Sequence, residues 1–108
     1  MTMKSTDPEA CRTMTEVRCG IDSLDAEMVR LIARRFRYMD AAARIKPERE
    51  AVRDEARKAE VLRNVTGHAR DLGAPEASVA ELYERLIEAS IAYEFDRFDE
   101  IRTADQPS

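Results

Sequence analysis

The longest helical pattern in this sequence runs from Thr13 to Lys46, and it constrains the fold more than any other feature. After Gly20 it contains no Gly or Pro until Pro47. Thr13 and Glu16 have the spacing of a capping box, which begins helices. Pro47 should end the helix because proline cannot continue the hydrogen-bond ladder and restrains the residue before it. Such a helix is roughly 50 Å long, whereas a compact chain of this size has a radius of gyration near ~13 Å. We therefore expect the helix to protrude and to find a partner.

Apolar residues recur along this helix in two rows at heptad spacing, which is typical of a helix that packs lengthwise on another. One row is Val17, Leu24, Leu31, Tyr38 and Ile45, and the other is Ile21, Met28, Arg35 and Ala42. Arg35 does not suit an apolar row, because burying an unpaired guanidinium costs several kcal/mol. Its side chain therefore either extends to water or meets an anion in the core.

The spacing of the basic residues bears on this choice. Lys46 lies eleven residues after Arg35, which is about three turns, so both side chains point the same way with Cα atoms roughly 16 Å apart. A small dianion fits between two such side chains. Arg18 lies some 25 Å from Arg35 along the helix, so it could reach the same ligand only from an antiparallel copy of the helix in a second subunit. The alternative is a set of solvated arginines on a charged helix.

Composition restricts the class of protein. The chain has 108 residues with a net charge of −4, enough for one domain, and its interleaved acids and bases do not form a basic nucleic-acid face. No apolar run approaches the ~20 residues of a membrane span, and the polar segment Met1 to Met14 lacks a signal core, so we expect a cytoplasmic protein. Cys11, Cys19 and His68 do not make a metal-ligand set, and neither a metal nor another cofactor is expected.

Two further helices are expected after the long one. The first spans roughly Arg53 to Leu72 and stops at Gly73, and the second runs from about Pro75 to Ile101 or Arg102. We expect residues 1–12 to be disordered or loosely attached, residues 13–102 to form the helical domain, and residues 103–108 to be a flexible tail. The fold class is therefore all-α with three helices, long, medium and long. Two chains pairing through their long helices would form an intertwined six-helix homodimer.

Polar residues interrupt the apolar face of the third helix. Ser90 and Glu94 lie one turn apart on the side that should be buried. A buried carboxylate needs a partner or a proton, and Arg35 and Lys46 are candidates for that partner. The alternative is a buried structural salt bridge.

Together these residues resemble the all-helical (AroQ-class) chorismate mutase family, which includes the related isochorismate pyruvate-lyases. The first helix contains "VRCGIDSLDAEMVRLIARRF" and "AAARIK", the second "AVRDEAR" and the third "LYERLIEASIAYE". The similarity extends from about Val17 to Phe98. It implies an enzyme that converts chorismate to prephenate by a Claisen rearrangement, without cofactor or covalent intermediate, at a site shared between two subunits. Such an enzyme holds a flexible dicarboxylate in its reactive shape and stabilises charge on the breaking ether bond.

The resemblance also assigns roles to individual residues. Carboxylate binding falls to Arg18 of one subunit, Arg35 of the other, Arg57, Ser90 and Lys46. Lys46 also donates to the ether oxygen, Glu94 stands beside that oxygen, and Asp54 lies near the ring hydroxyl. Lys46, Glu94 and Arg35 are thus the expected catalytic residues.

Two residues depart from the family pattern. Glu94 stands where many members have Gln, and a carboxylate can donate a hydrogen bond only when protonated. Lys58 stands where other members place a Glu that binds the ring hydroxyl. Because of Lys58, isochorismate pyruvate-lyase and aminodeoxychorismate mutase remain alternatives to chorismate mutase. A non-catalytic helical dimerisation module is an alternative of another class.

Overall fold

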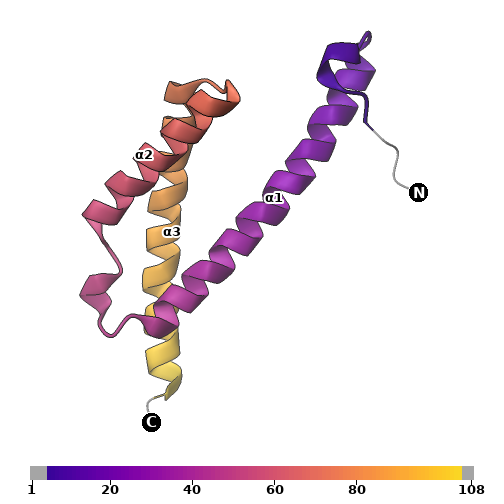
Figure 1. Ribbon diagram of the computed structural model, residues 1–108. Helices are drawn as coiled ribbons and strands as arrows, with labels where there is room; N and C mark the ends of the chain where they lie inside the picture. Colours follow the sequence, from indigo (N-terminus) through magenta and orange to yellow (C-terminus); the bar gives the residue numbers. More distant parts are fainter. Residues whose placement is uncertain (1–4, 106–108) are drawn as a thin grey trace. The chain divides into compact units, whose positions relative to one another are not determined.

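The computed structural model describes residues 5–105, which form an all-α chain (Figure 1). The helices are α1 (Met14–Ile45), α2 (Glu55–Leu72) and α3 (Glu76–Asp105), and short 3-10 turns form η1 (Pro8–Ala10) and η2 (Arg49–Ala51). This confirms the expected fold class and the long, medium and long order of its three helices. The pairing of two chains stays a prediction.

The chain divides into two compact units, Met1–Arg37 and Tyr38–Ser108. In the first unit, α1 begins with the capping box that the sequence predicted. The Thr13 backbone N–H donates to Glu16 Oε1 at 3.1 Å, and the Glu16 N–H donates to Thr13 Oγ1 at 3.2 Å. A hydrogen bond from the Arg12 backbone is the largest of several that lower the pKa of Glu16. Of the segment expected to be loosely attached, residues 1–4 lie outside the described part of the chain.

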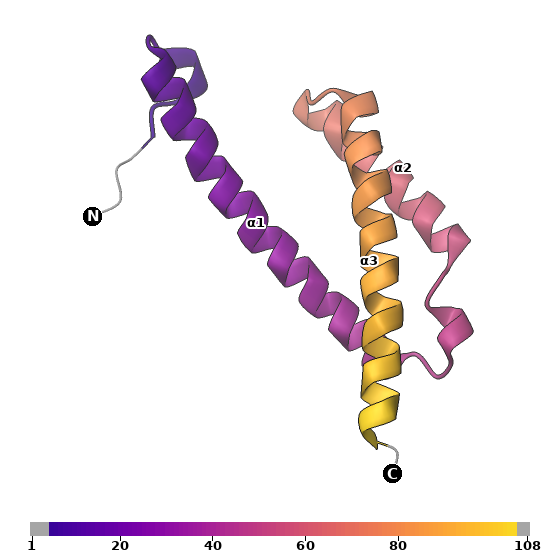
Figure 2. The same ribbon diagram turned by 180° about the vertical axis from the view of Figure 1, so that it is seen from behind.

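The second unit contains the end of α1, η2, α2 and α3. Both ribbon views show α2 and α3 side by side and joined by a short turn (Figures 1 and 2). Gly73 makes this turn with a φ of 74°, a left-handed conformation that glycine adopts without steric cost. The next N–H, that of Ala74, donates to Ala69 O at 2.8 Å, which completes a common helix ending. The predicted stop at Gly73 is confirmed.

Two helix boundaries differ from those expected. Helix α2 begins at Glu55 rather than Arg53 because Asp54 is its N-cap, outside the helix, and accepts a hydrogen bond from the Arg57 N–H. Helix α3 continues to Asp105, past Ile101 and Arg102. Thr103 and Ala104 are exposed, and a helix tolerates such residues on its solvent side, so the loss of apolar pattern there did not mark its end.

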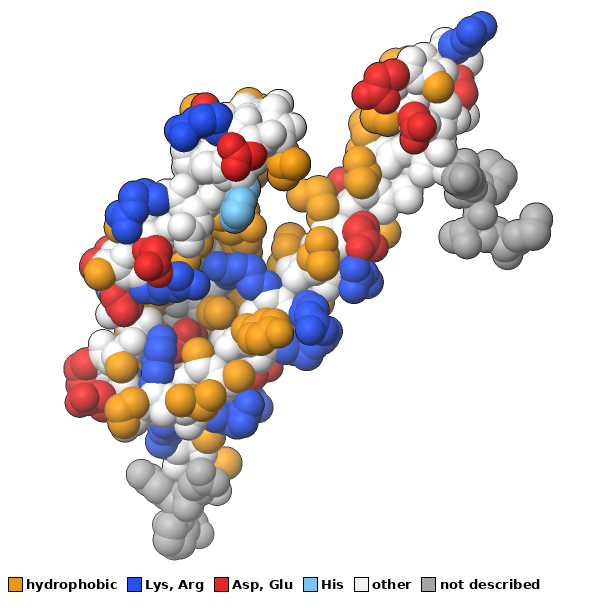
Figure 3. Space-filling model, in the orientation of Figure 1, with side chains coloured by type: hydrophobic (Ala, Val, Ile, Leu, Met, Phe, Trp, Pro, Cys, Tyr) orange, Lys and Arg blue, Asp and Glu red, His pale blue; other side chains and the backbone are white. Residues whose placement is uncertain are grey.

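A small core joins the end of α1 to α3 within the second unit. Ala43, Val52 and Phe98 are buried together, and Ile91, Phe95 and Ile101 pack against them. By contrast, the predicted apolar rows of α1 are largely exposed in the single chain: Ile21 is 50% exposed and Leu24 62%. Hydrophobic side chains are visible along α1 in the space-filling view (Figure 3). Among the described residues, no helix combines the length and the apolar character needed to cross a membrane.

Candidate active site

Lys46 and Glu94 form the most deeply placed ion pair of the second unit. Lys46 follows the last residue of α1, and its Nζ lies 2.6 Å from Glu94 Oε2 on α3. The Glu94 side chain is 5% exposed and that of Lys46 28%. Lys46 Nζ also donates to Val52 O at 3.3 Å. The pairing of Glu94 with Lys46, which the sequence allowed, is therefore present.

This pair retains unused hydrogen-bonding capacity. A lysine ammonium has three donors, and among the described residues Lys46 Nζ donates one hydrogen bond, to Val52 O, and forms an ion pair with Glu94. Glu94 Oε2 is fully buried, yet among the described residues it accepts no hydrogen bond of good geometry, despite its closeness to Lys46 Nζ. Buried polar groups are normally fully bonded. A partly exposed cation beside an under-bonded carboxylate is an arrangement that can receive a polar ligand.

Ser90 lies one turn before Glu94 on α3, and it too is buried, at 3% exposed. Its hydroxyl donates to Leu86 O at 2.7 Å, the bond by which a serine is tolerated inside a helix. Residues four apart share one helix face. Ser90, Glu94 and, through its ion pair, Lys46 are thus brought together.

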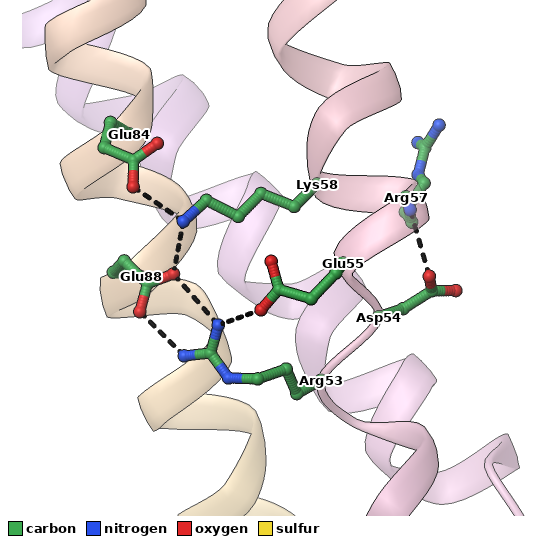
Figure 4. A network of polar contacts seen from close by, with 7 residues as sticks. All are labelled: Arg53, Asp54, Glu55, Arg57, Lys58, Glu84 and Glu88. Atoms are coloured by element: carbon green, nitrogen blue, oxygen red, sulfur yellow. Dashed lines mark hydrogen bonds and ion pairs between the residues drawn. The ribbon is translucent and has the colours of Figure 1, made fainter.

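The start of α2 places Asp54 and Arg57 next to each other (Figure 4). Asp54 Oδ1 accepts the Arg57 backbone N–H at 3.0 Å, so this carboxylate caps the helix. The Arg57 guanidinium pairs with Glu60 on its own helix. Both Asp54 and Arg57 are exposed. Their predicted contacts with the substrate stay predictions.

Lys58 is held by acidic residues of α3, in a network that sequence reasoning missed (Figure 4). Its Nζ lies 2.6 Å from Glu84 Oε1 and 2.8 Å from Glu88 Oε2. Arg53 donates to both oxygens of Glu88, at 2.7 and 3.2 Å, and to Glu55 at 2.8 Å. The hydrogen bonds from Arg53 and then Lys58 lower the pKa of Glu88 to about 2. The hydrogen bonds that Lys58 donates to Glu84 and then to Glu88 raise the pKa of Lys58.

Arg102 is a second residue that sequence reasoning did not single out. Its guanidinium donates to Ala43 O and to Lys46 O, both at 2.6 Å. The signal that could have found it is Pro47, which lacks the N–H that would otherwise serve Ala43 O. The end of α1 therefore needs a donor from elsewhere in the chain.

Arg18 and Arg35 belong to the first unit, on α1. Arg18 is exposed and Arg35 is half-buried. Their binding of substrate carboxylates stays a prediction. Within residues 5–105, no group of three or more His, Cys, Asp or Glu side chains could hold a metal ion.

Comparison with known proteins identifies the family. The family model described as chorismate mutase type II matches residues 17–95, so the chain belongs to the chorismate mutase type II family. The isochorismate pyruvate lyase of Pseudomonas aeruginosa is 29% identical to it over 97 residues, which cover 90% of this chain and 96% of the lyase. The protein is accordingly an enzyme of this family, either a mutase or a lyase.

Proposed function

We propose that this protein is a chorismate mutase that rearranges chorismate to prephenate without a cofactor. The observation that carries the proposal is the partly exposed Lys46 ammonium, which lies against buried Glu94, whose Oε2 accepts no hydrogen bond from the described residues. In the rearrangement an ether C–O bond breaks while a C–C bond forms, and negative charge develops on the ether oxygen. A fixed cation aimed at that oxygen lowers the barrier because the charge appears only in the transition state.

Glu94 has two roles in this proposal. As a carboxylate it holds the Lys46 ammonium in place, and as a carboxylic acid it can itself donate to the ether oxygen. Ser90, one turn earlier, and Arg57 would contact the substrate carboxylates. Arg35 and the Arg18 of a second subunit would bind the same dianion and keep it in its compact, reactive shape.

The proposed site requires a homodimer. The exposed apolar rows of α1 support it, because Ile21, Leu24, Met28 and Leu31 are each at least half exposed in the single chain. A contiguous apolar surface of this kind marks an interface, and the heptad spacing suits a second α1. The occupant we propose is another copy of this chain.

The direct test incubates the purified protein separately with chorismate and with isochorismate, and follows prephenate, salicylate and pyruvate. A mutase forms prephenate from chorismate and no pyruvate. Failure to convert either compound, in a protein shown to be folded and dimeric, would contradict the proposal. It would favour a non-catalytic dimerisation module instead.

A second candidate is isochorismate pyruvate-lyase, which splits isochorismate into salicylate and pyruvate. Two observations favour it: the similarity to the Pseudomonas aeruginosa lyase over nearly its whole length, and the basic Lys58 where mutases place an acid for the ring hydroxyl. Lys58 is occupied by Glu84 and Glu88. The same incubation separates the two activities, since only the lyase releases pyruvate.

A variant of Arg35 can distinguish a catalytic role from a role in assembly. If its cation serves the substrate, Arg35→Ala should abolish turnover while the protein keeps its helical circular dichroism and its dimeric mass. A dimerisation module would show the reverse, with altered assembly as the main effect. Arg30→Ala is a suitable control, since that exposed α1 arginine pairs only locally, with Glu27.

A further inference from the structure

Arg102 lies where α1 ends, and three contacts fix its guanidinium. Nη1 donates to Ala43 O and Nη2 to Lys46 O, both at 2.6 Å. The same group stacks on the Phe98 ring, 3.6 Å from its centroid. A planar guanidinium can make such a two-pronged contact and stack at once, whereas a lysine cannot. Arg102 is only partly exposed.

The need for this contact follows from Pro47. In an α-helix the carbonyl of residue 43 accepts the N–H of residue 47, and proline has none. Ala43 is fully buried, so its carbonyl could be satisfied by water only with difficulty, and an unbonded buried carbonyl is destabilising. Arg102 Nη1 supplies the missing donor, and Nη2 extends the same bridge to Lys46.

We propose that Arg102 is a positioning residue for Lys46, holding its backbone so that the ammonium meets Glu94 and the substrate. The inference rests on the proposed function, in which Lys46 acts on the ether oxygen. The contacts form a closed ring. Arg102 holds Lys46 O, Lys46 Nζ holds Val52 O at 3.3 Å, and Val52 packs in one core with Phe98, on which Arg102 stacks.

The ring explains why a residue that does not touch the substrate should affect the rate. Lys46 follows the last residue of α1. Its N–H still donates to Ala42 O, at 2.9 Å, and this is the last hydrogen bond in the helical pattern of α1. Beyond that bond, Arg102 restrains its carbonyl. A displacement of about 1 Å can cost on the order of 100-fold in rate, so loss of this restraint should reduce kcat more than it changes KM.

The test compares Arg102→Ala and Arg102→Lys with a matched control, Arg97→Ala. Arg97 is also a half-buried α3 arginine that bonds α1, through Asp40 at 3.2 Å, but it does not touch the Lys46 backbone. We expect kcat to fall about 10- to 100-fold in both Arg102 variants and to stay near wild type in Arg97→Ala. Added guanidinium ion should partly restore Arg102→Ala and leave Arg97→Ala unchanged.

A purely structural role would give a different pattern. Arg102→Ala and Arg97→Ala would then lose thermal stability and activity in parallel, and guanidinium ion would restore neither kcat. Either result, or an unchanged kcat in folded Arg102→Ala, would overturn the proposal. Circular dichroism of each variant shows whether it has folded, and Arg102→Lys provides a milder change if Arg102→Ala has not.

A second measurement does not depend on activity. Acetic anhydride labels amines according to their exposure and pairing, and mass spectrometry resolves Lys46 from Lys58. Arg102→Ala should speed the labelling of Lys46 severalfold relative to Lys58, and Arg97→Ala should not. If the wild-type protein converts no substrate, the proposed function fails. The role of Arg102 in positioning Lys46 fails separately, if the Lys46 labelling rate is the same in Arg102→Ala as in the wild-type protein.

Discussion

The two clusters of charge in the second unit differ in how they use their hydrogen bonds. The network at the start of α2 is partly exposed, and its central carboxylate is well bonded: Glu88 receives Arg53 on both oxygens and Lys58 on one. In the pair at the end of α1 the carboxylate is buried, and among the described residues Glu94 Oε2 accepts no hydrogen bond although Lys46 Nζ lies 2.6 Å away. Both contain a lysine with two close contacts and a glutamate, but of the two glutamates only Glu94 is buried and has an oxygen that accepts no hydrogen bond from the described residues.

Under the proposed function, this contrast separates a structural cluster from a catalytic one. An exposed ion pair gains little because water screens it, but an organised set can fix the orientation of a helix start. A buried carboxylate oxygen without a hydrogen bond is costly unless a ligand or a water molecule completes it. The Arg53–Lys58–Glu88 network joins α2 to α3, and a catalytic role for the Lys46–Glu94 pair stays the proposal.

The largest expected effect comes from replacing each of the two lysines in turn with methionine. Lys46→Met should lower kcat by about 100- to 1,000-fold, because it removes a preorganised donor to the developing charge. Lys58→Met should change kcat by less than about threefold, since its partners are partly exposed carboxylates. Steady-state kinetics with chorismate and isochorismate measure both. Equal losses in the two variants would abolish the distinction between the clusters.

The two glutamates should differ in their effect on the pH dependence. If Glu94 must donate, wild-type kcat should rise as pH falls, and Glu94→Gln should flatten the profile because an amide donates at every pH. Glu88→Gln should leave the shape of the profile unchanged. A wild-type rate that is constant between about pH 4 and 8 would count against donation by Glu94.

The smallest effect concerns stability in acid. The pKa of Glu88 lies at about 2, below its ordinary value of 4.5, chiefly because of the hydrogen bond from Arg53. A lowered pKa contributes stability that is complete above the unfolded value and is lost as pH falls from 4.5 towards 2. Urea unfolding across that range should show a smaller decline in Glu88→Gln than in wild type, and added salt should reduce the difference. Parallel curves would show that the network contributes nothing.

Local signals in the sequence predicted the helices well. Thr13 and Glu16 form the capping box with each other, and Gly73 ends α2 through its own backbone conformation. Both signals act within a few residues, so these helix ends do not depend on the rest of the fold. Asp54 was placed inside the second helix although it caps it, an error of two residues. Arg102 was treated as a helix end because the apolar pattern fades there, but the helix continues on its solvent-exposed side.

Contacts between distant residues were harder to predict. Lys58 meets Glu84 and Glu88 only because α2 folds back on α3 through the Gly73 turn, and its neighbours in sequence give no hint of this. Because Pro47 has no N–H to donate to Ala43 O, the sequence could have predicted that another group supplies this hydrogen bond. It could not have predicted that the group is Arg102. The contact between Lys46 and Glu94 was proposed from the need of a buried carboxylate for a partner and is present, but the catalytic roles of both residues stay predictions. The parts assigned to Arg18, Arg35, Asp54, Arg57 and Ser90 stay predictions.

The segment between α1 and α2 is fastened to the rest of the second unit at Arg49, Val52 and Arg53. Arg49 forms an ion pair with Asp99 at 2.9 Å and stacks over Phe95. Val52 is buried, and Arg53 forms an ion pair with Glu88. In evolution, the residue types of this segment can therefore change more readily than its length. An added residue would shift every later attachment point relative to the lysine, so insertions here should be selected against even though the segment is not helical throughout.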